Sequence, residues 1–201
     1  MKKTLLLLAI ALISSNLYAQ DFVDPDKSPM DAAFFPSQAA KRQFAKTEEQ
    51  KMALEPQIRV LYSRPSLNGR SIFRTTDNRK DGITKLGESW RVGANESTEL
   101  LLLKDAMIGG KLIKAGRYSI VITPSENEWT VHINSENDGW GGNYSHKPEL
   151  DLVTVTIPVT KDSKSLEQLS IALYSPKNDN TVHLKIGWGG TYRAELPIVL
   201  Q

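Results

Sequence analysis

The strongest constraint on the fold is an alternation of apolar and polar residues that begins after Pro56. Ile58, Val60 and Tyr62 alternate with Arg59 and with other residues of the opposite face, which is the period of a half-buried β-strand. Further strand-like runs, separated by Gly, Pro and Asn turn sequences, cover 100–103, 117–123, 129–133, 152–159, 166–174, 181–186 and 192–199. Many short strands without intervening long helices predict an all-β domain over residues 57–201, an antiparallel β-sandwich of the jelly-roll type.

The first nineteen residues have the composition of a secretory signal peptide. Lys2 and Lys3 precede an apolar run over 5–13, and Ala19 supplies a small residue for cleavage. The apolar run is too short to cross a membrane, and no later run approaches the required length. We therefore expect an exported soluble protein, periplasmic or extracellular, cleaved after Ala19 and without a membrane span.

Residues 20–56 differ in pattern from the rest of the chain. Proline and aspartate dominate the first part, which predicts an extended arm that docks through Phe34 and Phe35. Helix-forming residues dominate 37–54, with Ser37 as a candidate N-cap, and their thin apolar stripe predicts one short solvated helix.

Composition excludes some classes of function. Without Lys2 and Lys3, basic and acidic residues are equal in number, which argues against a nucleic-acid partner. The chain has no cysteine, so an exported form has no disulfide and depends on its hydrophobic core.

Several motifs occur in an order that resembles a known family. They are Ser28-Pro29-Met30-Asp31, Tyr62-Ser63-Arg64-Pro65-Ser66, Asn68-Gly69-Arg70, Trp90-Arg91-Val92-Gly93-Ala94-Asn95-Glu96-Ser97-Thr98, Lys114-Ala115-Gly116-Arg117-Tyr118-Ser119 and Trp129-Thr130-Val131. The chain resembles the secreted bacterial proteins grouped as Domain of Unknown Function 2911. That resemblance implies export and a β-rich fold, and it implies no established reaction. The link from Arg74 to Ser89 is longer and more charged than the short glycine-containing link usual in the family.

Charged residues beside two turns form the main candidate ligand site. Arg64 and Arg70 flank one turn, and Arg91 and Glu96 flank a second turn that contains Asn95. If the turns meet, three guanidinium groups converge, and guanidinium groups bind carboxylate or phosphate through paired donors. The alternative is an ion-pair network that only fixes the two turns.

Trp140 and Tyr144 form a second candidate surface within a glycine-rich segment. An accessible indole ring stacks on sugar faces, while neighbouring polar groups bind hydroxyls. The other tryptophans, Trp90, Trp129 and Trp188, are expected in the core. We therefore expect a binding or structural module for an anionic or carbohydrate-like small molecule, or for a glycan of the cell envelope.

Two other functions remain open. A glycan or ester hydrolase could use Glu96 as acid or base, although the sequence places no second carboxylate beside it. An envelope protein partner could dock on the N-terminal arm. The sequence assigns no catalytic residue, cofactor or metal ligand. His132, His146 and His183 form no close pair along the chain, and alternation places His132 and His183 opposite the apolar face of their strands.

Overall fold

The computed structural model describes residues 23–74, 76–137, 139–140, 145–177, 179–190 and 192–201. The expected signal peptide lies outside the described residues. No helix in these ranges is long and apolar enough to span a membrane.

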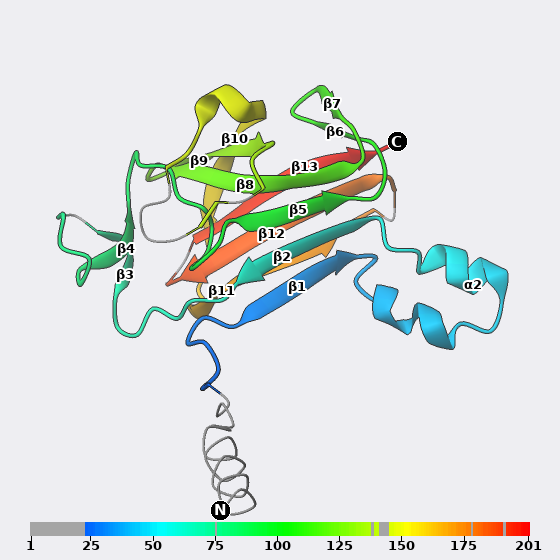
Figure 1. Ribbon diagram of the computed structural model, residues 1–201, viewed down its shortest axis with the longest axis horizontal. Helices are drawn as coiled ribbons and strands as arrows, with labels where there is room; N and C mark the ends of the chain where they lie inside the picture. Colours follow the sequence, from blue (N-terminus) through cyan, green and yellow to red (C-terminus); the bar gives the residue numbers. More distant parts are fainter. Residues whose placement is uncertain (1–22, 75, 138, 141–144, 178, 191) are drawn as a thin grey trace, which may run out of the picture.

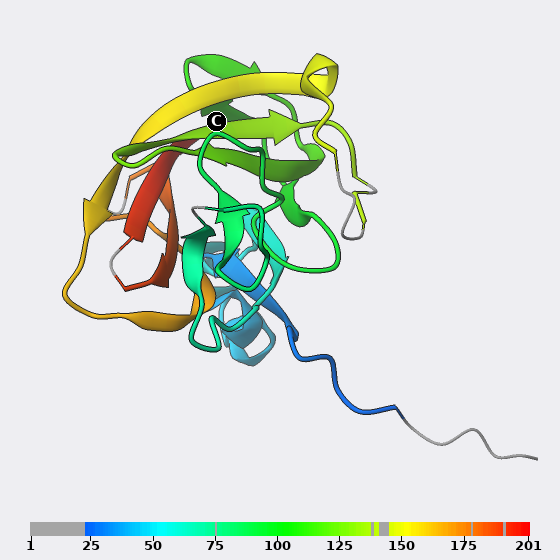
Figure 2. The same ribbon diagram turned by 90° about the vertical axis from the view of Figure 1, so that its left-hand side faces the viewer.

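One large antiparallel sheet dominates the structure (Figure 1). Its strands follow the spatial order β1-β2-β5-β8-β9-β10-β13-β12-β11. Their bounds are β1 Met30–Phe35, β2 Ile58–Ser63, β5 Thr98–Leu102, β8 Gly116–Pro124, β9 Glu128–Asn134, β10 Asp151–Lys161, β13 Tyr192–Leu200, β12 Thr181–Gly189 and β11 Leu166–Tyr174. The hairpin of β6 (Ala106–Ile108) and β7 (Lys111–Ile113) extends the sheet along β13. The predicted all-β antiparallel fold is confirmed, in the form of one sheet that curls until its two ends nearly meet (Figure 2).

The segment that follows β2 links the two ends of this sheet. Ser66 forms an antiparallel bridge with Gln168 of β11, and the Leu67 amide donates to the carbonyl of Glu167 at 2.9 Å. Deeper in the sheet, the Tyr62 hydroxyl accepts from the amide of Ile171 at 3.1 Å. These bonds pair backbone groups that an open sheet edge would leave exposed.

The core lies inside the curled sheet and contains the alternating apolar residues. Trp129 and Trp188 are fully buried and Trp90 is 6% exposed, which confirms the expected core tryptophans. Trp90 stacks on Trp188 at 5.6 Å between ring centroids and meets Trp129 edge-on at 6.5 Å.

Part of the predicted extended arm is a strand of the large sheet. Met30–Phe35 is strand β1, which pairs with β2 along its whole length. The expected single helix is two short pieces, a 3-10 helix at Ala39–Phe44 and α2 at Glu48–Ala53. Thr47, not Ser37, caps the α-helix, because its hydroxyl accepts from the Gln50 amide.

A small parallel pair, β3 (Ser71–Arg74) and β4 (Gly82–Lys85), lies at the opposite end of the sheet from α2 (Figure 1). Strand β3 ends at the first residue of the long charged link, Arg74 to Ser89, that distinguishes this sequence, and β4 lies within that link. A third short helix, 3-10 in type, covers Pro148–Leu150 before β10.

A polar network joins three strands near the closure of the sheet. Glu195 of β13 accepts from Tyr174 at 2.6 Å, from Lys185 at 2.9 Å and from His183 at 3.0 Å. Burial raises the pKa of Glu195, but the hydrogen bonds from Tyr174, Lys185 and His183 outweigh burial and lower it to about 2. The hydrogen bond to Glu195 raises the pKa of Tyr174 to about 12. His183 is thus a cross-strand polar residue, as its position in the alternation predicted.

The closure of the sheet predicts the cost of Tyr62→Phe. This change removes the acceptor of the Ile171 amide at a buried position, so it should lower the free energy of unfolding by about 1–3 kcal/mol. Urea denaturation measures the effect. Tyr118→Phe is the matched control, because the Tyr118 hydroxyl donates to the Lys114 carbonyl at an exposed turn, and this change should cost less than about 0.5 kcal/mol. Equal losses in the two variants would contradict a role for Tyr62 in closure.

The Glu195 network predicts a pH dependence of stability. The pKa of Glu195 is about 2 in the folded state, below its ordinary value of 4.5. The ionised carboxylate therefore makes its full contribution to the free energy of unfolding above about pH 4.5. That contribution disappears as the pH falls from about 4.5 to about 2. Denaturation at a series of pH values should give a flatter acid limb for Glu195→Gln than for the wild type. Ultraviolet titration of the same variant should show a lower pKa for Tyr174, whereas Glu126→Gln on an exposed turn should change neither property.

Candidate functional site

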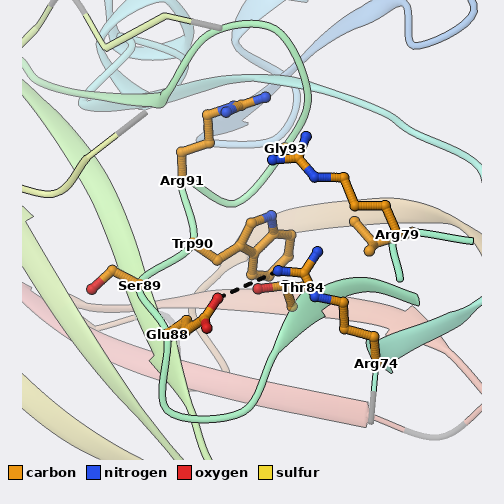
Figure 3. Close-up of a pocket in the computed structure, with 9 residues that line it drawn as sticks. Arg74, Arg79, Thr84, Glu88, Ser89, Trp90, Arg91 and Gly93 are labelled. Atoms are coloured by element: carbon orange, nitrogen blue, oxygen red, sulfur yellow. Dashed lines mark hydrogen bonds and ion pairs between the residues drawn. The ribbon is translucent and has the colours of Figure 1, made fainter. Parts of the chain in front are cut away.

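A cavity of about 230 Å³ lies between the β3–β4 pair and the segment before β5 (Figure 3). Three guanidinium groups line it, those of Arg74, Arg79 and Arg91, with Glu88 as the single carboxylate among the lining residues. We call this group of residues, with Trp90, the arginine cleft. Its ionised side chains carry a net positive charge, which favours an anion.

The β3–β4 pair brings Arg74 and Arg79 to one side of the cleft. Arg74 ends β3, and Arg79 lies in the loop that leads to β4. Gly82 lets the two strands approach, since a Cβ at this position would lie only 2.5 Å from the Arg74 nitrogen. Arg74 is oriented by a 3.4 Å ion pair with Glu88, drawn as the dashed line in Figure 3.

Trp90 forms the floor of the cleft. Its backbone amide and carbonyl pair with Ile122 of β8 at 2.7 and 2.8 Å, and its ring stacks on Trp188. The indole nitrogen Nε1 is buried and has no hydrogen-bond partner among the described residues. In Figure 3 the N–H edge of the ring faces the side on which Arg79 and Arg91 lie. A buried donor in this position is stabilised by an acceptor on a bound ligand.

The backbone that carries Arg91 is strained. Val92 has a φ of +59°, a conformation that is rare for a β-branched residue, and its side chain is fully buried. Thr98 holds this turn, because its hydroxyl donates to the Val92 carbonyl at 2.6 Å and its amide donates to the Arg91 carbonyl. Strain of this kind, maintained by buried hydrogen bonds, is typical of functional turns.

The structure separates the arginines that the sequence grouped together. Arg64 donates to the Leu169 carbonyl and pairs with Asp31 at 3.1 Å, so it helps to close the sheet. Arg70 donates to the carbonyls of Ser66 and Leu67 within its own turn. Arg91 alone of the three predicted arginines lines the cleft, and its partners there are Arg74 and Arg79.

The other predicted residues lie on the turn beyond Arg91. Asn95 occupies a left-handed conformation with a φ of +63°, and Glu96 forms a backbone bridge with Trp140. Trp140 is 66% exposed, so its ring is accessible beside this turn. Tyr144 lies outside the described residues.

A second polar group, which the sequence did not predict, lies on the outer face of the sheet. His132 of β9, His146 of the following loop and Asp151 of β10 converge, and we call these residues the histidine cluster. Asp151 contacts His132 Nδ1 and His146 Nε2, each at 2.8 Å, and the two imidazole centroids are 4.5 Å apart. Burial raises the pKa of Asp151, but the hydrogen bonds from His146, Asn134 and His132 outweigh burial, so this pKa lies below its usual range.

Local sequence patterns indicated some residues of the arginine cleft and of the histidine cluster, but not their contacts. The charged link from Arg74 to Ser89 marked the arginines as unusual, but their approach to Arg91 depends on β3–β4 pairing. The alternation placed His132 on the outer face, yet only the loop before β10 brings His146 beside it.

Comparison with curated proteins finds no match, and comparison with solved structures finds none either. A family model described as a protein of unknown function, DUF2911, matches residues 44–198 and confirms the resemblance carried by the Trp90–Thr98 motif. The match extends from the short helical region through most of the last strand, β13. The chain therefore belongs to the DUF2911 family of proteins of unknown function.

Proposed function

We propose that this is an exported binding protein for a small anionic molecule, held in the arginine cleft. The observation that carries the proposal is the convergence of three guanidinium groups around one cavity, two from the β3–β4 region and one from the segment before β5. Arginine binds carboxylate and phosphate groups through paired donors in a fixed plane, so the cleft favours a ligand that carries one of these groups.

Trp90, the floor of the arginine cleft, and the turn at Val92 both favour a role in binding an anion over a purely structural role. The buried Trp90 N–H adds a neutral donor beside the guanidinium groups. The turn at Val92 is fixed before any ligand arrives, which reduces the entropy lost on binding.

A carbohydrate portion of the ligand has a candidate contact at Trp140. Its ring is exposed beside Glu96 and Asn95, where it offers a flat surface for stacking. This contact would add to anion binding. A sugar phosphate is therefore a more informative probe than a neutral sugar.

Binding measurements test the arginine cleft directly. Calorimetry with inorganic phosphate, citrate and glucose 6-phosphate should show binding of at least one anion, with affinity that falls as sodium chloride increases. Arg79→Ala and Arg91→Ala should each weaken binding by about 10–100-fold, which corresponds to the loss of one charge-assisted hydrogen bond. Trp90→Phe should weaken it less, because the ring remains and only the N–H donor is lost.

Arg117→Ala is the matched control, because Arg117 pairs with Glu99 on strands outside the cleft and is 58% exposed. It should leave anion affinity unchanged. Binding that is equally weakened by Arg117→Ala, or unchanged in Arg79→Ala and Arg91→Ala, would contradict the proposed site. Glucose alone serves as the neutral probe, and any binding of glucose that Trp140→Ala removes would assign the sugar contact.

A further inference from the structure

The histidine cluster has the composition of a metal site. Each residue offers one ligand atom, and the ligand atoms of His132, His146 and Asp151 all lie within 4.8 Å of one another. Metal–nitrogen and metal–oxygen bonds of about 2.0–2.2 Å place neighbouring ligands of a tetrahedral ion about 3.4 Å apart. The observed contacts of 2.8 Å from Asp151 to each imidazole nitrogen are close to that spacing, so small side-chain movements admit an ion.

Polar side chains around the histidine cluster contact the second ring nitrogen of each histidine and one oxygen of Asp151. His132 Nε2 lies 3.1 Å from the Thr123 hydroxyl, and His146 Nδ1 lies 3.1 Å from the Ser89 hydroxyl. The Asn134 amide donates to Asp151 Oδ1 at 2.8 Å. Metal-binding histidines typically have such a partner on the second ring nitrogen, which fixes the ring and its tautomer.

Hydroxyl partners make the cluster compatible with both the free and the metal-bound protonation states. Without an ion, a neutral imidazole whose N–H faces the Asp151 carboxylate donates to it, and its other nitrogen accepts from the hydroxyl of Thr123 or Ser89. With an ion, the inner nitrogen binds the metal and the outer nitrogen carries the proton. The hydroxyl then accepts that proton, because serine and threonine both donate and accept.

Burial and charge favour a cation here. The side chains of His132, His146 and Asp151 are 13%, 6% and 12% exposed, so the cluster is shielded but reachable from solvent. The ammonium group of Lys147 pairs with Glu136, and the Lys147 backbone carbonyl accepts from the Asn134 amide.

We propose that the histidine cluster binds one divalent transition-metal ion of the zinc type. His132 Nδ1, His146 Nε2 and an Asp151 oxygen are the protein ligands. Two imidazoles and one carboxylate suit zinc and its neighbours, whereas magnesium and calcium prefer sites made only of oxygen. Three protein ligands leave a coordination position for water or for a ligand. His132, His146 and Asp151 do not line the arginine cleft, although Ser89, whose hydroxyl lies 3.1 Å from His146 Nδ1, does.

Calorimetry with zinc on the purified full chain, prepared without a histidine tag and treated with a chelator, tests the site. The wild type should bind one equivalent of Zn²⁺, and Mg²⁺ and Ca²⁺ should give no signal. His132→Ala, His146→Ala and Asp151→Asn should each weaken zinc binding by more than about 100-fold, since loss of an outer-shell partner alone costs about 10–100-fold. Ser89→Ala should fall within that smaller range.

His183→Ala is the matched control, because His183 also bonds a carboxylate, Glu195, but has no second histidine beside it. The zinc affinity of the His183→Ala variant should equal that of the wild type. Cobalt bound to the wild type should give visible absorption bands that zinc removes, and X-ray absorption should show nitrogen and oxygen ligands at about 2.0–2.1 Å. These two spectra decide the question even where a ligand variant fails to fold. No stoichiometric zinc binding by the wild type, or equal binding by the ligand variants, would overturn the proposal and leave a hydrogen-bonded cluster only.

Discussion

The closure between β11 and the segment after β2 is the interaction on which the rest of the structure depends. A single sheet with two free edges leaves backbone groups exposed and cannot enclose a core by itself. The bridge from Ser66 to Gln168 and the bond from the Ile171 amide to Tyr62 bring the two ends together. Arg64 adds a bond to the Leu169 carbonyl and an ion pair with Asp31 of β1. The enclosed space then holds the stacked pair of Trp90 and Trp188, and Trp90 forms the floor of the arginine cleft.

The local patterns of the sequence were sufficient to predict the strands but not their partners. Alternation over Ile58–Ser63 and over Glu128–Asn134 records which face of a strand is buried, because side chains point to opposite faces in turn. It carries no information about the residues across the interior. For that reason the arginines beside two turns were grouped together, whereas closure uses Arg64 and the cleft uses Arg91.

The residues that were missed share one physical property. Arg74, Arg79 and His146 take part in their sites through contacts with distant segments, and each lies at a strand end or in a loop. Proline and aspartate in the arm likewise predicted an extended segment, and the extended segment proved to be strand β1, because the free edge of β2 offered it a partner. Extended conformation is a local preference, whereas membership of a sheet depends on an available edge.

Ser89, Trp90 and Arg91 connect the two proposed sites through consecutive residues. Pairing of Trp90 with Ile122 holds this segment as an extension of the sheet, so successive side chains point to opposite faces. Trp90 therefore enters the core and forms the cleft floor, while Ser89 reaches Thr123 and His146 on the outer face. After Trp90 the strained turn at Val92 ends the alternation and carries Arg91 to the cleft. One short segment thus positions the floor of the arginine cleft and an outer partner of the histidine cluster, so a single sheet holds both of these chemically different groups.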